Sequence, residues 1–309
     1  MKRVVITGAT GAIGTALIRE MIENEIEVLV LCRTNSERNK RIPNHPLVKV
    51  KYCSLEQLNE VKNDTGKRYD VFYHFAWLGT TGDARNDTHL QNQNIAYALD
   101  AVHAATEFGC DVFIGAGSQA EYGRVDGILK PNTPTVPENG YGIAKLCAGF
   151  MTREKAHQEG MKHIWVRILS VYGPNDGAQS MVMSTINSLQ KGIVPKCTKG
   201  EQMWDYLYNG DAAKAFRLLG EKGVDGKNYV LGSGKVRPLA EYIKEIQKIV
   251  NPSCALGLGE IPYAPKQVMH LQADISDLQQ DTGFEPNTDF ATGIQQILEW
   301  RKTYELSGR

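Results

Sequence analysis

The sequence predicts an α/β protein with a doubly wound parallel sheet and a smaller C-terminal lobe whose segments interleave with that sheet. Three observations predict this class. A glycine-rich turn follows the first strand-like run, short β-branched runs alternate with longer helical patterns through the first half, and this alternation loosens after residues 172–174. Strands that alternate with helices are typical of a parallel sheet covered by helices on both faces.

The predicted strands are short runs rich in valine, isoleucine and aromatic residues. Helical periodicity separates them; over 88–108, for example, Ile95, Leu99 and Val102 share one face of the predicted helix. From about residue 236 onward the pattern is one of isolated helices with more proline and glycine, which predicts the smaller lobe. The predicted strands lie at 4–6, 27–31, 47–50, 70–73, 111–114 and 163–166, with a further strand at 229–231.

Composition narrows the functional classes. Across 309 residues, 35 lysines and arginines balance 35 aspartates and glutamates, which gives no electrostatic reason to expect nucleic acid or an anionic membrane as a partner. No apolar run reaches the length of a transmembrane helix. The cysteines form no C-x-x-C pair, which predicts reduced thiols in a cytoplasmic protein. The histidines show no metal-ligand spacing, so we expect no metal site.

A glycine-rich turn joins the first predicted strand to the first predicted helix. Residues 7–14 read Thr-Gly-Ala-Thr-Gly-Ala-Ile-Gly. A pyrophosphate bound at a helix N-terminus needs bare backbone N–H groups, because side chains there keep the anion away. A glycine pattern alone also fits an ordinary turn, but this strand-to-helix position favours a Rossmann-type dinucleotide site. The predicted phosphate-binding set is Gly8, Thr10, Gly11, Ala12, Ile13 and Gly14.

The end of the second predicted strand indicates which dinucleotide binds. An acidic residue there bonds the ribose 2′-hydroxyl of NAD, whereas this strand ends on Leu31-Cys32-Arg33, and Arg38 follows closely. Guanidinium groups suit the 2′-phosphate of NADP. We therefore expect NADP(H), with Arg33 and Arg38 as phosphate ligands. NAD(H) stays open, because Arg33 can also be a solvated loop charge.

A tyrosine and a lysine four residues apart, Tyr141 and Lys145, lie on one face of a predicted helix. Ser118 follows a strand at the carboxyl edge of the sheet, where open α/β sheets bind ligands. A lysine ammonium near a tyrosine favours the phenolate, which lets the tyrosine exchange protons at neutral pH. A serine hydroxyl there would hydrogen-bond the reacting oxygen. These three residues are the predicted catalytic set of an NAD(P)-dependent oxidoreductase.

The order of these motifs resembles that of the extended short-chain dehydrogenases/reductases, the NAD-dependent epimerase/dehydratase family that modifies nucleotide-linked sugars. The resemblance covers nearly the whole chain. It implies that Lys145 also bonds the nicotinamide ribose and that Ala76 and Asn94 line the cofactor. It further implies a homodimer, in which the helix at 88–108 and the helix carrying Tyr141 form the interface. Other matching segments are His74-Phe75-Ala76, residues 167–173, Trp204-Asp205-Tyr206 and residues 283–286.

Departures from the family pattern indicate which of the reactions that the resemblance implies is expected for this chain. Sugar 4,6-dehydratases of this family have Asp-Glu after the catalytic hydroxyl residue, whereas this chain has Gln119 and Ala120, and Glu121 is a weak substitute acid. UDP-sugar epimerases have an arginine where Trp204 stands and an asparagine where Ser170 stands. Together with the basic strand end, these differences favour an NADPH-dependent reductase of a nucleotide-linked 4-keto sugar, with hydride transfer at C4. The alternatives are an NAD-dependent nucleotide-sugar 4-epimerase and, more remotely, a non-catalytic NADP-sensing protein.

The predicted substrate contacts lie where the carboxyl edge of the sheet meets the C-terminal lobe. The loop after the fourth strand combines an indole with small polar residues, a composition suited to sugar stacking and hydroxyl hydrogen bonds; a packing role for its tryptophan is equally open. We predict that residues 1–170, with roughly 205–235, form the NAD(P)-binding domain, and that 171–204 and 236–309 form the substrate-binding lobe. The predicted substrate-binding set is Trp77, Thr80, Arg85, Gln119, Glu121, Ser170 and Trp204.

Overall fold

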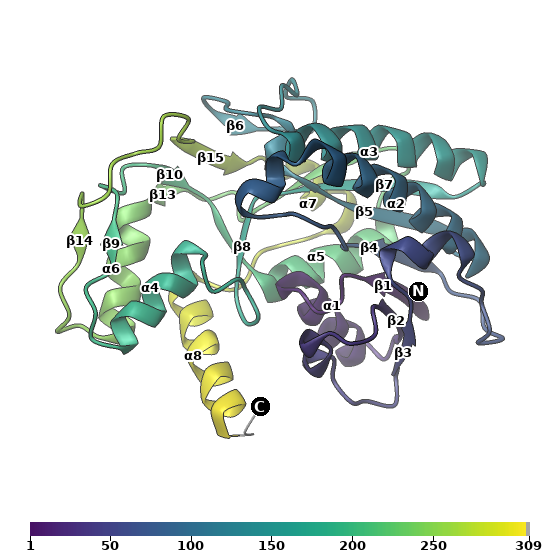
Figure 1. Ribbon diagram of the computed structural model, residues 1–309, viewed down its shortest axis with the longest axis horizontal. Helices are drawn as coiled ribbons and strands as arrows, with labels where there is room; N and C mark the ends of the chain where they lie inside the picture. The colour runs from purple at the N-terminus through teal and green to yellow at the C-terminus, as the bar shows by residue number, and fades with distance from the viewer. Residues whose placement is uncertain (307–309) are drawn as a thin grey trace.

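A parallel sheet of seven strands forms the centre of the computed structural model, which describes residues 1–306 (Figure 1). Its spatial order is β12-β7-β5-β4-β1-β2-β3. The chain starts at β1 and builds outwards in both directions, so the strand order reverses beside β1, the place where open α/β sheets bind ligands. The strands are β1 (Arg3–Thr7), β2 (Glu27–Cys32), β3 (Val48–Tyr52), β4 (Val71–His74), β5 (Val112–Ser118), β7 (Lys162–Ile168) and β12 (Asn228–Leu231).

Helices cover both faces of this sheet, which confirms the predicted fold class. Val4 and Ile6 of β1 belong to a core that includes α1 (Ala12–Glu23) and α5 (Asn209–Lys222). Val5, whose side chain points to the opposite face, belongs to a second core with α2 (Thr88–Glu107) and α3 (Gly140–Gln158). Each predicted strand overlaps one observed strand, because strands buried on both faces are short, nearly continuous apolar runs.

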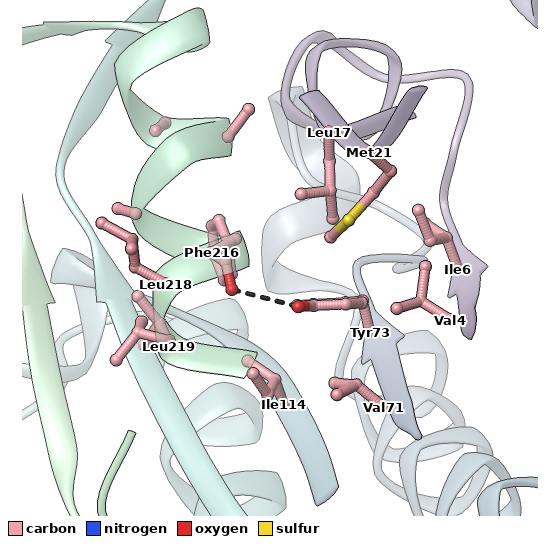
Figure 2. Packing of buried hydrophobic residues seen from close by; sticks show 14 of the residues in the cluster. Val4, Ile6, Leu17, Met21, Val71, Tyr73, Ile114, Phe216, Leu218 and Leu219 are labelled. Carbon is pink, nitrogen blue, oxygen red and sulfur yellow. Dashed lines mark hydrogen bonds between the residues drawn. The ribbon is translucent and has the colours of Figure 1, made fainter. Parts of the chain in front are cut away.

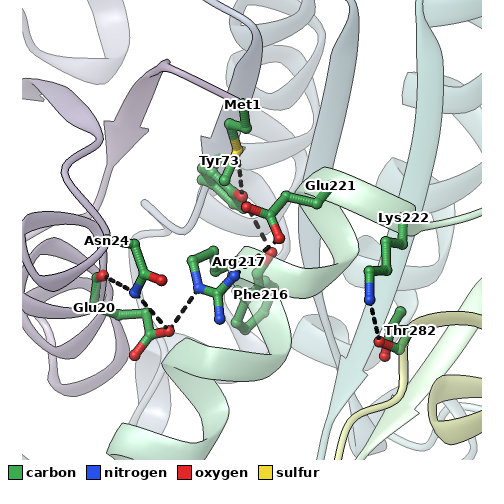
Figure 3. A network of polar contacts seen from close by, with 9 residues as sticks. All are labelled: Met1, Glu20, Asn24, Tyr73, Phe216, Arg217, Glu221, Lys222 and Thr282. Atoms are coloured by element: carbon green, nitrogen blue, oxygen red, sulfur yellow. Dashed lines mark hydrogen bonds and ion pairs between the residues drawn. The ribbon is translucent and has the colours of Figure 1, made fainter.

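One polar contact joins the sheet to α5 inside the larger core. The hydroxyl of Tyr73 on β4 donates to the backbone carbonyl of Phe216 at 3.1 Å (Figure 2). Gly220 permits this approach, because a Cβ there would overlap the Tyr73 hydroxyl. Arg217 then links α5 to α1 through an ion pair of 2.7 Å with Glu20 (Figure 3). Apolar burial and these bonds together hold α1 and α5 under the sheet.

A second, smaller body lies in the C-terminal part of the chain (Figure 1). Its core is formed by α4 (Met181–Gln190), α6 (Leu239–Val250) and α8 (Phe290–Leu306). Short strand pairs surround it: β6 (Ile128–Leu129) with β15 (His270–Ala273), β8 (Ser170–Tyr172) with β11 (Tyr206–Tyr208), β9 (Lys196–Cys197) with β14 (Gly257–Leu258), and β10 (Met203–Trp204) with β13 (Arg237–Pro238) and β15. The 3₁₀ turns are η1 (Glu37–Arg41), η2 (Leu55–Glu60), η3 (Gly82–Asn86) and η4 (Gln119–Glu121).

The two parts interleave. After the smaller body the chain returns to the sheet, where α7 (Ser276–Thr282) packs against α5 and β12, and Leu278 and Phe284 enter the larger core. Lys222 of α5 donates to the carbonyl of Thr282 at 3.3 Å (Figure 3). The domain boundaries therefore stay a prediction. Within residues 1–306, no helix is long and apolar enough to cross a bilayer.

Phe216→Ala should destabilise the fold by about 3–5 kcal/mol, because the ring is fully buried against Tyr73 and Phe75 and its loss leaves a cavity. Tyr73→Phe is the matched control, since it removes only the hydroxyl and should cost about 1 kcal/mol. Urea unfolding followed by circular dichroism measures both free energies. Equal losses for the two variants would contradict this packing.

Candidate active site

The glycine turn between β1 and α1 has the geometry of a phosphate cradle. Gly8 has a φ of +70°, and a Cβ there would lie 2.5 Å from the backbone nitrogen of Ala76. A Cβ on Gly14 would lie 2.5 Å from the carbonyl oxygen of Gly8, so both glycines are required by packing. A Cβ on Gly11 would meet only that same oxygen, at 3.5 Å, and would otherwise occupy open space. The turn therefore leaves room for a phosphate at Gly11 and fits a dinucleotide.

The N-terminus of α1 is open to an anion and is held from outside. Gly11 is its N-cap, with no side-chain capping bond among the described residues. Arg41 donates to the carbonyl of Thr10 at 3.1 Å, and Asn209 donates to the carbonyl of Ala12 at 3.0 Å. The predicted set omits Arg41 and Asn209, which act through backbone carbonyls far away in the sequence. These contacts orient the N–H groups of the first turn, including that of Ile13, without blocking them.

The segment that follows β2 is basic and accessible. Arg33 and Arg38 are both exposed, and the amide of Asn39 donates to the Arg33 carbonyl at 2.9 Å. The first acidic residue after β2, Glu37, pairs with Lys40 at 2.7 Å. Because this pair neutralises the acid, the segment keeps a surplus of positive charge beside the predicted adenosine ribose.

Two amide side chains of α2 hold the loop that follows β4. Asn94 Oδ1 accepts from the N–H of Leu78 and Asn94 Nδ2 donates to its carbonyl, both at 2.9 Å. Gln91 Oε1 accepts from the indole of Trp77 at 2.9 Å, and Gln91 Nε2 donates to the carbonyl of Gly79 at 2.9 Å. Both amides are buried. They fix the loop in place, and the cofactor contact of Asn94 stays a prediction.

The start of α3 packs closely on the turn that carries Ser118. Asn139 caps the helix by accepting from the N–H of Gly142 at 2.8 Å. Gly142 is required here, because a Cβ would overlap the carbonyl oxygen of Ala120 in η4. This close approach places Tyr141 beside Ser118, whose hydrogen bonding acts to lower the pKa of the Tyr141 phenol. The first turn of α3 therefore places Tyr141, the predicted acid–base, next to Ser118, whose hydroxyl is predicted to bind the reacting oxygen.

Lys145, one helical turn after Tyr141, completes the predicted catalytic set. Its Nζ donates to the carbonyl of Ala116 on β5 at 2.6 Å and lies 5.9 Å from the centroid of the Tyr141 ring. Ser118 is the last residue of β5. Gln119, a predicted substrate contact, follows it as the first residue of η4 and is half-buried. The structure thus brings Ser118, Tyr141 and Lys145 together at the carboxyl edge of the sheet.

Glu121 lies beneath this site, with none of its surface exposed. Its carboxylate accepts from the backbone N–H of Ser118 at 2.8 Å, the indole of Trp165 at 3.0 Å and the guanidinium of Arg167 at 2.7 Å. Each carboxylate oxygen is therefore held by protein donors. We assign Glu121 the positioning of Ser118 rather than the substrate contact that its sequence position suggests.

Trp165 and Arg167 are absent from the predicted site. Two glycines on the neighbouring strand β5 are the feature of the sequence from which the buried Trp165 indole could have been predicted. Gly115 pairs with Trp165 and Gly117 with Arg167 across β5 and β7. A Cβ at either glycine would overlap the indole. Alternate glycines in a buried strand therefore mark a large side chain lying across it.

Burial shifts the pKa values of the predicted catalytic residues Lys145 and Tyr141. Burial lowers the pKa of Lys145 to about 7, against the opposing charge of Glu121. Burial also raises the pKa of Tyr141, while a hydrogen bond from Ser118 and the charge of Arg85 act to lower it. A tyrosine in this setting is a proton donor at neutral pH, and the nearby cations stabilise the phenolate that it leaves.

The loop after β4 surrounds Tyr141 with an indole and a guanidinium. The Nζ of Lys145 lies 3.8 Å from the centroid of the Trp77 ring, which in turn contacts the Tyr141 ring edge to face at 6.2 Å. The guanidinium of Arg85 lies 4.2 Å from the Tyr141 centroid and donates to the carbonyl of Thr80 at 2.8 Å. Three predicted substrate contacts are thus gathered around the predicted catalytic tyrosine.

Two further predicted substrate contacts, Trp204 and Ser170, bond to each other. The indole of Trp204 on β10 donates to the hydroxyl of Ser170 on β8 at 2.8 Å. The hydroxyl of Tyr242 donates to the backbone carbonyl of Trp204 at 3.0 Å, which fixes the strand from α6. Trp204 is half-buried, so it combines a packing role with a surface that a ligand can reach.

A cavity of about 310 Å³ lies between α4 and α6. Gln202, only 3% exposed, contributes a side-chain oxygen that has no hydrogen-bond partner among the described residues. A buried acceptor without a partner is costly, so this oxygen favours a ligand that donates to it. In the described part of the chain, no group of three or more His, Cys, Asp or Glu side chains is arranged to hold a metal ion. The cavity wall includes Met181, Ser184, Thr185, Lys196, Gln202 and Ile243.

Relatives of known activity act on nucleotide-linked sugars. CDP-abequose synthase of Salmonella typhimurium is 23% identical over 96% of this chain and 97% of its own length. The dTDP-4-dehydro-6-deoxyglucose reductase of Escherichia coli is 24% identical over 96% of each chain. A trifunctional enzyme of Arabidopsis thaliana with UDP-glucose 4,6-dehydratase, UDP-4-keto-6-deoxy-D-glucose 3,5-epimerase and UDP-4-keto-L-rhamnose reductase activities is 24% identical over 97% of this chain, which spans 47% of that protein.

Solved structures share the fold across almost the whole chain. UDP-N-acetylglucosamine 4-epimerase from Methanobrevibacter ruminantium superposes with a TM-score of 0.87 at 23% identity, covering 98% of this chain and 99% of its own. UDP-glucuronic acid 4-epimerase from Bacillus cereus, in complex with UDP-glucuronic acid and NAD, superposes with a TM-score of 0.84 at 19% identity, with the same coverage of 98% and 99%.

A model of the NAD dependent epimerase/dehydratase family matches residues 4–232, which include the glycine turn, the predicted catalytic serine and the tyrosine–lysine helix. The match confirms the family that the motif order predicts. This chain is an enzyme of the NAD-dependent epimerase/dehydratase family.

Proposed function

We propose that this chain is an NADPH-dependent reductase of a nucleotide-linked 4-keto sugar, with hydride transfer at C4. Two arrangements support the proposal. Ser118, Tyr141 and Lys145 meet at the edge of the sheet as an acid–base set for a carbonyl. Arg33 and Arg38 stand exposed at the end of β2 and suit the 2′-phosphate of NADPH. The arginines at the end of β2 are the observation that favours a reductase over an epimerase. They suit NADPH, and a reductase takes up a fresh reduced cofactor in each turnover.

The residues of the site divide the chemistry between them. The bound cofactor supplies a hydride to the carbonyl carbon. Tyr141 gives its phenolic proton to the carbonyl oxygen, so the C=O bond becomes an alcohol with new C–H and O–H bonds, and Tyr141 is left as phenolate. Ser118 hydrogen-bonds the same oxygen and stabilises its developing charge. Lys145 stabilises the phenolate until solvent returns a proton.

The turn after Ser118 does not suit dehydration. Removing a C5 proton and expelling the C6 oxygen requires an acid–base pair beside the catalytic hydroxyl. Gln119 and Ala120 carry no ionisable group. Glu121 is fully buried and bonded to Trp165 and Arg167, so its carboxylate does not face a substrate. A reductase or an epimerase needs neither group.

The cavity between α4 and α6 suits the nucleotide of the substrate. Its wall combines apolar side chains with the hydroxyls of Ser184 and Thr185, and the buried oxygen of Gln202 offers an acceptor for a nucleobase N–H group. Trp204 stands where the resemblance to UDP-sugar epimerases implies a phosphate-binding arginine. Lys196 lies on the cavity wall and forms a loose ion pair with Glu260, at 3.8 Å. We take Lys196 as the candidate phosphate ligand that replaces this arginine.

An NAD-dependent nucleotide-sugar 4-epimerase is the second candidate. It would use the same Tyr141 acid–base and return the hydride to the same sugar. The solved structures of similar fold favour it, since they include 4-epimerases and one of these holds NAD. The names of two relatives favour a synthase or reductase of deoxysugar nucleotides. Retention or exchange of the cofactor separates the two reactions.

We also infer a homodimer through α2 and α3. Ile143, Phe150 and Met151 lie on one side of α3, at helical spacing, and are 55%, 47% and 47% exposed. Large apolar side chains gathered on one helix face are unfavourable in water and are typical of an interface. A second copy of the same face would cover them.

Arg33→Ala should weaken NADPH binding about tenfold and leave NADH binding unchanged, because only NADPH offers a 2′-phosphate to the guanidinium. Isothermal titration with each cofactor measures both affinities, on protein whose purified cofactor content is known. Arg68→Ala, at the amino-terminal edge of the sheet, is the control for loss of one surface cation. Tightly bound, co-purifying NAD with no preference for the 2′-phosphate would rule out the reductase and favour the epimerase.

Tyr141→Phe should lower turnover at least about 100-fold while NADPH still binds, because the variant loses the proton donor and keeps the ring. The assay follows NADPH oxidation with dTDP-4-keto-6-deoxyglucose, and a parallel assay follows conversion of UDP-glucose to UDP-galactose. Tyr52→Phe, an exposed tyrosine on β3, is the matched control. Undiminished turnover in the Tyr141 variant would show that another group supplies the proton.

Met151→Glu should convert a dimer into monomers, because it places a charge within the inferred apolar face. Sedimentation equilibrium measures the mass of the wild type and the variant. Val224→Glu, a similarly exposed apolar residue outside α3, should leave the mass unchanged. A wild-type protein that is monomeric at all concentrations would refute the interface.

A further inference from the structure

Arg85 lies directly on the ring of the catalytic tyrosine. Its guanidinium carbon is 4.2 Å from the Tyr141 centroid, the separation of a cation–π contact. Its Nη1 donates to the carbonyl of Thr80 at 2.8 Å, which orients the group from within its own loop. In the described part of the chain, no carboxylate lies within ion-pair distance of this guanidinium. The ring of Tyr141 therefore faces a cation that is not neutralised.

The loop that carries Arg85 is fastened to the helix that carries Tyr141. Asn86 Oδ1 accepts from the N–H of Gly140 at 3.2 Å, at the first residue of α3. A Cβ on Gly140 would lie 3.0 Å from the carbonyl oxygen of Arg85, so a glycine allows η3 to sit this close. Gln91 holds the other side of the loop by donating to the carbonyl of Ala84 at 2.9 Å. The guanidinium is thus fixed relative to the phenol and is not a freely moving surface charge.

The charged groups that face Tyr141 come from three elements. Arg85 approaches from η3, Lys145 from α3, and Glu121 from η4, where Arg167 neutralises it. Burial lowers the pKa of Lys145 to about 7, so this lysine is only partly charged near neutral pH. An arginine stays charged throughout. Reduced nicotinamide carries no positive charge, so before hydride transfer Arg85 is the permanent cation beside the phenol.

We propose that Arg85 is a positioning residue of the reaction, which holds the Tyr141 ring by stacking and stabilises the phenolate that remains once the proton has passed to the substrate oxygen. The sequence places Arg85 among the substrate contacts, whereas this role acts through Tyr141. The inference deepens the proposed reductase and rests on Tyr141 being its proton donor. Loss of the cation then makes Tyr141 a weaker acid, even in the absence of substrate.

The ionisation of Tyr141 tests the proposal without any sugar. Ultraviolet absorbance of phenolate is titrated against pH in the full chain, and the titration of the same protein carrying Tyr141→Phe is subtracted. Arg85→Gln keeps an N–H donor for Thr80 and removes the charge, so the pKa of Tyr141 should rise by about one unit, a tenfold change in the phenolate fraction. Arg85→Lys should restore most of the original value. Arg68→Gln, the distant control, should cause no change.

Kinetics supply the second readout. Reduction needs the protonated phenol, so kcat with NADPH and dTDP-4-keto-6-deoxyglucose falls as pH rises through the pKa of Tyr141. In Arg85→Gln this fall should move to higher pH by the same unit, and Arg85→Lys should move it back. A variant with a raised KM and an unchanged Tyr141 titration would overturn the proposal and make Arg85 a substrate contact. If the wild type reduces no 4-keto sugar, the proposed function fails, and the titration still decides the role of Arg85.

Discussion

The buried carboxylate of Glu121 is the constraint on which the active site depends. A carboxylate with no exposed surface is tolerated only when its charge and lone pairs are matched by donors. Its donors come from the end of β5 and from the neighbouring strand β7, so one group ties the two strands to the turn between them and α3. Because Ser118 is one of these donors through its backbone, a bond beneath the site holds the main chain that carries its hydroxyl, and the hydroxyl itself accepts from the N–H of Ala120 at 3.2 Å. The close packing of α3 on η4 then brings Tyr141 next to Ser118.

A backbone contact connects the cofactor side of the site to the substrate side. Gly8, in the phosphate turn, packs against the backbone of Ala76, and the loop that carries Trp77 and Arg85 starts at the next residue. The spacing between a bound dinucleotide and the catalytic phenol is therefore set by main-chain atoms, which have little freedom to adjust. The amides of α2 hold the same loop from its other side. Main-chain contacts and buried side-chain amides thus hold the loop in one position, which is the form of support that a hydride-transfer geometry requires.

The sequence predicted those parts of the molecule that depend on local pattern. Strands were visible as apolar runs, the phosphate turn as spaced glycines, and the pair Tyr141 and Lys145 as neighbours on a helix. Contacts between side chains on strands far apart in the sequence were not visible. Glu121 resembled a spare acid beside Ser118, because only the pairing of β5 with β7 brings Arg167 to it. Trp165 was missed for the same reason, and the stacking of Arg85 depends on how η3 meets α3, which no residue spacing reveals.

The bond between Trp204 and Ser170 has a consequence for substrate affinity. It joins two neutral groups where the resemblance to UDP-sugar epimerases implies an arginine, so this part of the wall offers packing and a hydrogen bond. An attraction between a guanidinium and a phosphate weakens as dissolved ions screen both charges. A neutral pair has no such dependence. In the proposed substrate site, the contribution of this position to affinity is therefore insensitive to ionic strength and comes from the shape of the wall.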